Sequence, residues 1–327
     1  MTRALLSIAV LGLLGCGGNH IPARQRLSVD SPGALCFDPT GRTLAVGAAV
    51  GVEIWNTGTW RRTGRLATDT EFVNTLACGQ DGRLLLAGED SPLQSWDPVA
   101  SRLLAAIDTG PVRSLAAGPN GRTVVTSNGT AAAVVWDFAT RRQLRPLVGS
   151  QEAVLALALS PDATTLAVGK SGLDIEIFDV SSGRRLRRLK AMGDSFNRVE
   201  AVAVSGDGKL LATGTSIGWL EIWDLASGRS LHSFRAHVSF FGEGASVEAL
   251  AFGPQGQLAS GGADGTVRLW NPQTGRQRAL FSDHSRASLS WNPDLRLWPN
   301  ALAFSPDGSL LASSHQRNVV RIWKIPG

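Results

Sequence analysis

A serine in a nucleophile-like pattern and five histidines are the residues of this chain that invite a chemical interpretation. Gly214-Thr215-Ser216-Ile217-Gly218 fits G-x-S-x-G, which exposes a serine nucleophile only where a strand turns sharply into a helix. Here the pattern lies between two strand-like stretches, and no helical pattern follows it. The histidines, at positions 20, 232, 237, 284 and 315, have no paired spacing that would place two metal ligands on one element. We therefore expect no catalytic serine, no metal and no cofactor.

The thiol of Cys16 is a candidate for covalent modification. Arg3 precedes an apolar run of eleven residues from Ala4 to Leu14, which is too short to span a bilayer. The segment Leu13-Leu14-Gly15-Cys16 follows and resembles the lipobox of bacterial lipoprotein signals. That resemblance implies cleavage before Cys16 and attachment of a lipid to its sulfur.

These features divide the chain into a signal peptide at residues 1–15, a lipidated tether at 16–21 and one folded domain at 22–327. The alternative for the first segment is a plain signal peptide or an uncleaved anchor. Gly17 after the cysteine favours the outer membrane, without fixing the side on which the domain lies.

An aromatic residue recurs at nearly constant spacing along the rest of the chain. The copies are Trp55, Trp96, Trp136, Phe178, Trp223, Trp270 and Trp323, at intervals of 41, 40, 42, 45, 47 and 53 residues. Self-similarity at this period indicates a repeat architecture.

Each aromatic also follows a turn signal. The seven turns resemble Ser305-Pro306-Asp307-Gly308, in which proline presets φ and glycine accepts positive φ. The last turn residue precedes the aromatic by 14 or 15 residues in every copy. The distance from each aromatic to the end of the next turn grows instead, from 27 and 25 to 33 and 38 residues. The variation is therefore confined to one connection per repeat.

Four short strand-like stretches occur in each repeat, as in residues 247–252, 257–260, 266–270 and 276–281. Four strands in a unit of this length predict propeller blades. The repeats resemble the WD-repeat family over residues 22–327. The resemblance implies an all-β, seven-bladed propeller of four-stranded antiparallel blades.

The two ends of the chain predict how the ring closes. The last repeat stops soon after Trp323 and lacks an outer strand, whereas residues 22–29 read like an outer strand with no blade of their own. As in members of the family, we expect residues 22–29 to complete the seventh blade. Closure removes a seam that would otherwise pair with other chains.

The resemblance also implies a structural hydrogen-bonded network in one blade, formed by His237, Ser260, Asp264 and Trp270. Arg317, Gly172 and Ile217 occupy the aspartate position in the seventh, fourth and fifth blades. We expect most other blades to rely on apolar packing.

Cys36 and Cys78 are the remaining cysteines. Export would permit a disulfide. They sit on differently facing positions of equivalent strands, and such strands of neighbouring units are predicted to be too far apart to bridge. We therefore expect two small buried apolar side chains.

The growing connections carry the best candidates for partner binding. In the family they lie on the so-called top face of the propeller. Here they include aromatic and arginine residues, which are frequent at binding hot spots; the candidates are Phe196, Phe240, Phe241, Arg286, Trp291, Arg296 and Trp298. The alternative is that these rings fold back over the base of their own loops.

The sequence therefore favours a lipid-anchored, non-catalytic protein-binding scaffold at the bacterial cell envelope, with the bottom or the side of the propeller toward the membrane. The partner is an unidentified protein. The export signal disfavours nucleic acid, and no small-molecule substrate is evident. The alternatives are an envelope propeller enzyme, either a hydrolase or quinone-dependent, and an outer-membrane assembly factor.

Arginines on the predicted outer strands are explained either by protection of strand edges or by contact with anionic lipid.

Overall fold

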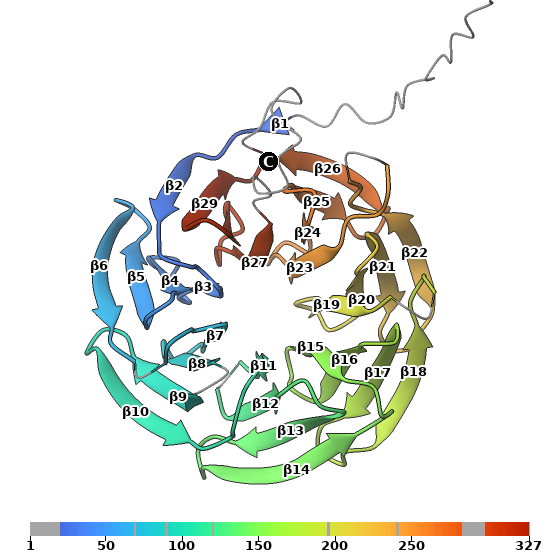
Figure 1. Ribbon diagram of the computed structural model, residues 1–327, viewed down its shortest axis with the longest axis horizontal. Helices are drawn as coiled ribbons and strands as arrows, with labels where there is room; N and C mark the ends of the chain where they lie inside the picture. Colours follow the sequence, from blue (N-terminus) through green and yellow to red (C-terminus); the bar gives the residue numbers. More distant parts are fainter. Residues whose placement is uncertain are drawn as a thin grey trace, which may run out of the picture.

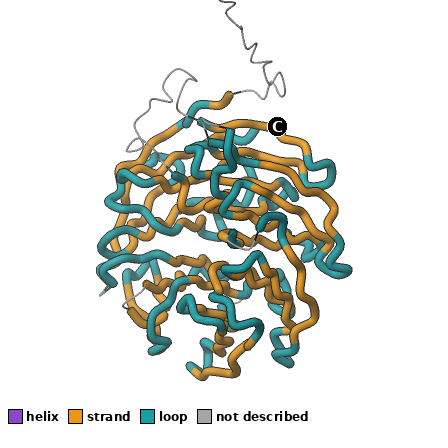
Figure 2. Tube along the Cα trace, turned by 45° about the vertical axis from the view of Figure 1, so that its right-hand side comes forward, coloured by secondary structure: helices purple, strands orange, loops and turns teal. Residues whose placement is uncertain are grey.

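The structure, a computed structural model, describes residues 20–68, 70–88, 91–119, 121–194, 197–239, 242–282 and 298–326. These residues form seven four-stranded antiparallel sheets arranged around a central axis (Figure 1). Strands joined by loops make up the described chain, with no helix among them (Figure 2). The predicted seven-bladed, all-β propeller is confirmed.

Each blade runs from an inner A strand at the axis through B and C strands to an outer D strand at the rim. The first three blades contain β3 (Leu35–Phe37), β4 (Thr43–Gly47), β5 (Val52–Asn56) and β6 (Arg61–Leu66); β7 (Thr75–Cys78), β8 (Leu84–Gly88), β9 (Ser91–Asp97) and β10 (Arg102–Ile107); and β11 (Ser114–Ala117), β12 (Thr123–Ser127), β13 (Ala132–Asp137) and β14 (Arg142–Val148).

The fourth, fifth and sixth blades repeat this order. They contain β15 (Val154–Leu159), β16 (Thr165–Lys170), β17 (Asp174–Asp179) and β18 (Arg185–Lys190); β19 (Val199–Val204), β20 (Leu210–Thr215), β21 (Trp219–Asp224) and β22 (Ser230–Arg235); and β23 (Val247–Phe252), β24 (Leu258–Gly262), β25 (Val267–Asn271) and β26 (Arg276–Phe281).

The seventh blade is built from both ends of the chain. Its first three strands are β27 (Pro299–Phe304), β28 (Leu310–His315) and β29 (Val319–Lys324), and its D strand is β2 (Gln25–Ser28). β2 pairs antiparallel with β29, with Leu27 opposite Val320. The predicted closure by the N-terminal segment is confirmed.

A short strand, β1 (His20–Ile21), was not expected from the sequence. It pairs in parallel with the end of β26 and adds a fifth strand to blade 6. The chain therefore contacts the outer edge of blade 6 before it completes blade 7, as Figure 1 shows at the top of the ring.

Seven hydrophobic cores lie between adjacent blades, one for each interface of the ring. The closing interface, between blades 7 and 1, buries Leu27 and Val29 together with Leu44 and Val320. The recurring aromatic explains the repeat, because each packs against the blade that precedes it: Trp136 belongs to the core between blades 2 and 3, and Trp323 to the core between blades 6 and 7.

The antiparallel order gives the ring two chemically distinct faces. The D–A and B–C connections emerge on one face, which we call the upper face, and the A–B and C–D turns emerge on the other, the lower face. The lengthening connections seen in the sequence are D–A connections, so all of them emerge on the upper face.

Candidate functional site

The blade 6 network joins four side chains from three separate segments of the chain: the D–A connection, the B strand with the turn that follows it, and the C strand. The Nδ1 atom of His237 lies 2.9 Å from Oδ1 of Asp264, and its Nε2 atom lies 2.7 Å from Oγ of Ser260. The indole of Trp270 donates to the same serine oxygen at 2.8 Å. The network ties the D–A connection to the B and C strands of the blade.

Glycine makes room for this network. A Cβ atom on Gly262 would lie 2.2 Å from Cγ of His237, so a side chain at this position would displace the imidazole. Burial by itself raises the pKa of Asp264, but the charge and hydrogen bond of His237, with contributions from Arg268 and Thr266, outweigh it and hold the pKa well below its ordinary value.

The order of contacts in this network resembles that of a serine nucleophile, its base and an orienting carboxylate. Ser260 and His237 are fully buried, however, and the indole N–H of Trp270 already occupies the serine oxygen. A substrate has no path to the serine hydroxyl, so the geometry serves to hold the blade together.

Two other blades contain buried polar networks that the sequence analysis missed. In blade 7, the His315 ring contacts Oγ of Ser313 at 2.7 Å and Nη1 of Arg321 at 2.9 Å, and Trp323 donates to Ser313 at 2.8 Å. Blade 7 is therefore an exception to the expected reliance on apolar packing, since its polar groups come from its own B and C strands.

In blade 4, Lys170 fills the equivalent position at the end of the B strand. Its ammonium donates to the carbonyl oxygens of Ala131 and Glu152 at 2.9 and 3.1 Å and lies 3.5 Å from the Glu176 carboxylate. Burial lowers the pKa of Lys170, and the charge of Glu176 opposes this effect. Here too apolar packing is not the whole account, because the fully buried Glu176 also accepts a 2.7 Å hydrogen bond from Arg185.

A common signal marks these two blades. The B strands align on the residue that pairs with the aromatic. The fourth residue after it is Lys170 or His315 in these two blades, and Ala48, Gly88, Asn128, Thr215 or Gly262 in the others. A long or ring-bearing polar side chain at a position that otherwise holds a shorter residue predicts a buried polar contact.

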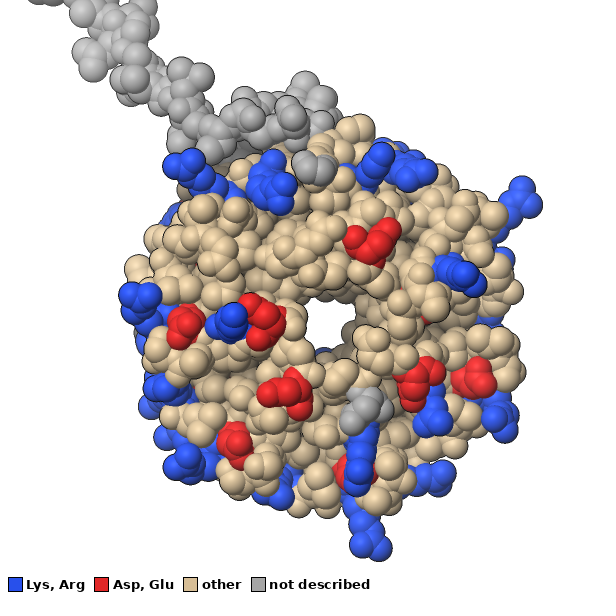
Figure 3. All heavy atoms as spheres, turned by 180° about the vertical axis from the view of Figure 1, so that it is seen from behind, with Lys and Arg blue, Asp and Glu red and all other residues tan. Residues whose placement is uncertain are grey.

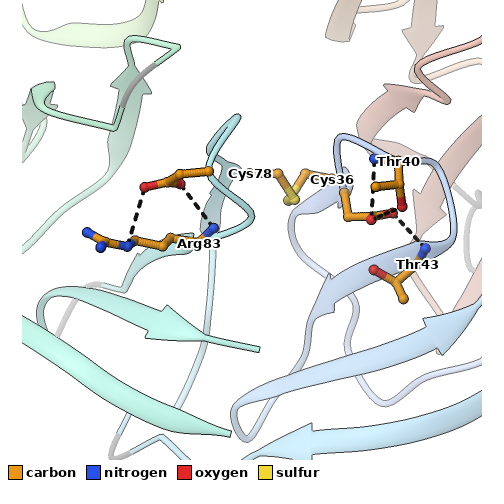
Figure 4. Close-up of a disulfide and its surroundings, with 7 residues drawn as sticks. Cys36, Thr40, Thr43, Cys78 and Arg83 are labelled. Carbon is orange, nitrogen blue, oxygen red and sulfur yellow. Dashed lines mark hydrogen bonds and ion pairs between the residues drawn. A yellow bond between two sulfur atoms is a disulfide. The ribbon is translucent and has the colours of Figure 1, made fainter. Parts of the chain in front are cut away.

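The two cysteines that were expected to be separate form a disulfide, so that prediction is wrong. Cys36 in β3 and Cys78 in β7 are bonded, with a Cα–Cα distance of 5.8 Å (Figure 4). Inner strands converge toward the axis, which brings neighbouring blades within bridging distance. Each blade turns one side of its sheet toward the preceding blade and the other side toward the next. Cys36 and Cys78 lie on opposite sides of equivalent strands, so their side chains point into the same gap between blades 1 and 2.

Turns flank this disulfide on both sides. Figure 4 shows the A–B turns of blades 1 and 2, in which Asp38 accepts from the backbone N–H of Thr43 at 2.7 Å and Asp81 pairs with Arg83 at 3.3 Å. The disulfide therefore links two blades near their lower-face turns.

Most of the predicted partner-binding residues lie outside the described residues. They are Phe196, Phe240, Phe241, Arg286, Trp291 and Arg296, and Cys16 lies outside them as well. Trp298 is described; it is half-buried immediately before β27, where its carbonyl accepts from the Gln316 backbone at 3.3 Å. Its indole N–H is buried and has no hydrogen-bond acceptor among the described residues.

The G-x-S-x-G segment lies where β20 meets β21. Thr215 ends β20 and is fully buried, and the backbone then turns at Gly218 with φ of 83° directly into β21. No helix follows, so the strand-to-helix turn that exposes a serine nucleophile is missing at this place.

The described residues offer little for ligand chemistry. Among them, no three His, Cys, Asp or Glu side chains converge in a way that would hold a metal ion. A groove of about 410 Å³ lies at the rim between blades 4 and 5 and is lined by Arg184, Leu186, Arg187 and Leu225. Both arginines are exposed, so the groove lacks the buried convergent polar groups of a small-molecule site.

The described part of the chain contains no helix long and apolar enough to cross a membrane.

Charge is distributed radially. Figure 3 shows an opening at the centre of the ring, acidic groups nearer to it, and basic groups along the rim. The seven D strands contain arginines and one lysine but no Asp or Glu.

Residues 228–271 and 275–324 match the family model described as WD domain, G-beta repeat. Each matched segment begins at the D strand of one blade and ends at the C strand of the next, so the sequence repeat is offset from the structural blade by one strand. The chain is similar to WD-repeat propellers.

Known relatives are long proteins of which this chain spans a small part. It is 26% identical to telomerase protein component 1 of Mus musculus over 93% of this chain and 11% of the relative. It is 29% identical to a WD repeat-containing protein 91 homolog of Dictyostelium discoideum over 40% of this chain and 18% of the relative. For the B-type cell cycle switch protein ccs52B of Medicago truncatula, the identity is 28% over 39% of this chain and 28% of the relative.

Proposed function

We propose that this chain is a lipid-anchored, non-catalytic protein-binding scaffold at the bacterial cell envelope. The observation that carries the proposal is the one-sided growth of its connections. The D–A connections lengthen toward blades 5 to 7, all emerge on the upper face, and contain the aromatic and arginine residues named above. A rigid ring that presents adaptable loops on one face is suited to binding a protein.

Two independent features support a location outside the cytoplasm. The N-terminal pattern ending at Cys16 resembles a lipoprotein signal. The structure contains a disulfide between Cys36 and Cys78. Disulfides persist in oxidising compartments and are rare in reducing ones. Neither feature depends on the other, because one concerns residues before the propeller and the other its inner strands.

The non-catalytic character rests on the polar groups of the described residues. The best candidate for chemistry, the contact between His237 and Ser260, is fully buried. The similarity to WD-repeat propellers supports the same proposal.

Replacing Trp291 and Trp298 together with alanine tests the upper face. Quantitative crosslinking in the native host should lose a specific partner that the wild-type chain captures. The matched control, Val99→Ala with Leu103→Ala, trims exposed apolar groups on blade 2 and should keep that partner. Since Trp298 is half-buried, the melting temperature of each variant must be measured. The charge reversal Arg286→Glu with Arg296→Glu provides a second variant that leaves Trp298 in place. If both upper-face variants keep the partner with an intact fold, the proposed surface is wrong.

Replacing Cys16 with serine tests the anchor separately. The wild-type protein should incorporate labelled fatty acid and fractionate with membranes, whereas the serine variant should do neither. A serine variant that stays in the membrane fraction without label would remove lipidation from the proposal but leave the upper-face surface untouched.

A further inference from the structure

Among the described residues, the C and D strands of one sector of the ring lack acidic side chains. On the C strands, the second residue before the aromatic is Glu53, Glu176 or Glu221 in blades 1, 4 and 5, but Arg268 and Arg321 in blades 6 and 7. The C strands of blades 2 and 3 end in aspartate. The C and D strands of blades 6 and 7 contain no Asp or Glu at all.

Some rim arginines of the other blades contact these acidic groups. In blade 1, Arg62 contacts Glu53 at 2.7 Å, and in blade 4 Arg185 contacts Glu176 at 2.7 Å. Arg276 and Arg278 of blade 6 have no acidic partner among the described residues. On the rim of blade 4, Arg185 and Arg188 are paired with Glu176 and Asp174.

Three arginines are exposed on the rim of this sector. Arg276 and Arg278 belong to β26, and Arg24 immediately precedes β2. We call this set the basic wall. The upper edge of the ring in Figure 3 accordingly shows basic but no acidic groups along the rim.

The N-terminal segment enters the fold at the same place. His20 and Ile21 pair with Leu280 and Phe281 at the end of β26, and Ile21 and Ala23 pack against the core between blades 6 and 7. Cys16 lies four residues before His20, a reach of about 14 Å even when the chain is fully extended. A lipid on Cys16 would therefore hold the basic wall next to the membrane surface.

We propose that the basic wall rests on anionic lipid headgroups, so that the propeller stands on the rim of blades 6 and 7. This inference rests on the proposed lipid anchor and replaces the expectation that the lower face or an unspecified side faces the membrane. In this orientation the tunnel axis runs along the membrane plane, and the upper-face loops remain open to a partner. An acyl chain combined with a basic patch binds membranes more stably than the chain alone.

The experiment uses the full protein, reconstituted through its N-terminus in vesicles with and without phosphatidylglycerol. An environment-sensitive fluorophore is attached at Ser28→Cys, on the same face of β2 as Arg26, or at Leu144→Cys, on the outer strand of blade 3. Quenching by nitroxide-labelled headgroups should be strong at position 28 and weak at position 144, and only in the anionic vesicles. Raising the salt from about 0.1 M to about 1 M shortens the screening length from roughly 10 to 3 Å and should abolish the contact.

Charge variants provide the matched comparison. Arg276→Gln with Arg278→Gln should lower the equilibrium constant for membrane contact at position 28 by about 25-fold, since each arginine near an anionic surface contributes about fivefold. Arg102→Gln with Arg142→Gln removes the same charge from blades 2 and 3 and should leave the contact unchanged.

The inference is overturned if position 144 is quenched as strongly as position 28, if both variants act alike, or if neutral vesicles give the same result. A protein that is membrane-bound but shows any of these outcomes refutes the basic wall alone. A wild-type protein that does not associate with vesicles overturns the proposed anchor together with this inference.

Discussion

At the scale of single residues, the acceptor for each recurring indole depends on its blade. Trp136, Trp223, Trp270 and Trp323 donate to a Thr or Ser of the neighbouring B strand. In blades 1 and 2 that B-strand position is Val46 or Leu86, and the indole donates to Glu53 or Gln94 of its own strand instead. In blade 4 the position is Val168 and the aromatic is Phe178, which has no donor. Every blade with a tryptophan at this position therefore supplies an acceptor for the indole N–H, because a buried N–H without an acceptor is costly.

Blade 3 offers a clean test of this matching, because Val134 occupies the position of the alternative acceptor. Thr126→Val leaves the indole N–H of Trp136 without its 2.9 Å acceptor and should lower the free energy of unfolding by about 1–3 kcal/mol. In a Trp136→Phe background the same change should cost much less. Urea denaturation of the two single variants and the double variant measures the coupling. Equal costs in both backgrounds would show that the hydrogen bond does not matter.

Asp264 sets the acid sensitivity of blade 6. Its folded-state pKa is depressed, so its contribution to stability is present above the unfolded pKa, near 4, and is lost as the pH falls through the folded value. Asp264→Asn should lower the free energy of unfolding by about 3 kcal/mol at pH 7. The difference from wild type should shrink as the pH is lowered below about 4. Asp81→Asn, which removes an exposed ion pair with Arg83, should change stability by less than about 1 kcal/mol and serves as the control.

At the scale of elements, the inner strands of blades 1 and 2 are covalently joined. The disulfide closes a loop with a sequence separation of 42 residues between two strands that form no ladder with each other. In the chain-entropy description such a link stabilises the folded state mainly by restricting the unfolded chain.

Removing this link should therefore destabilise the propeller without altering its blades. Cys36→Ala with Cys78→Ala should lower the free energy of unfolding by about 4 kcal/mol. A reducing agent should shift the urea midpoint of the wild-type protein toward that of the variant and leave the variant unchanged. A wild-type midpoint that ignores the reducing agent would show that the bond does not form in solution.

At the scale of the whole molecule, the N-terminal strand makes the ring continuous without covalent closure. β2 completes blade 7, and the backbone N–H of Arg24 donates to the carbonyl of Ile322 at 2.8 Å. The end of β29 and the start of β2 are therefore as close as the C and D strands of any other blade.

A circular permutant tests this equivalence. The chain would begin at Ser31, run to Pro326 and continue through two glycines to Arg24 and on to Asp30. It should fold with one cooperative transition, and its stability should lie within about 1 kcal/mol of a chain that begins at Arg24. Loss of cooperativity in the permutant would mean that the order of β2 in the chain, and not only its pairing, is required.

The sequence by itself determined the number of blades, the four strands of each and the contribution of residues 22–29, because the aromatic and the turn recur in a fixed local register. It also supplied the members of the blade 6 network, through the resemblance to a known repeat family. Local patterns carry such information because the strands of a blade are neighbours in the chain.

Only the tertiary structure decided what lies between blades and around the ring. The Cys36–Cys78 bond depends on how closely the inner strands converge at the axis, and the ion pair of Lys170 with Glu176 depends on the register of two strands. The strand β1 places His20 and Ile21 beside β26, a strand that contains two arginines and no Asp or Glu. These relations join residues that are distant in the chain, so no periodic pattern in the sequence encodes them.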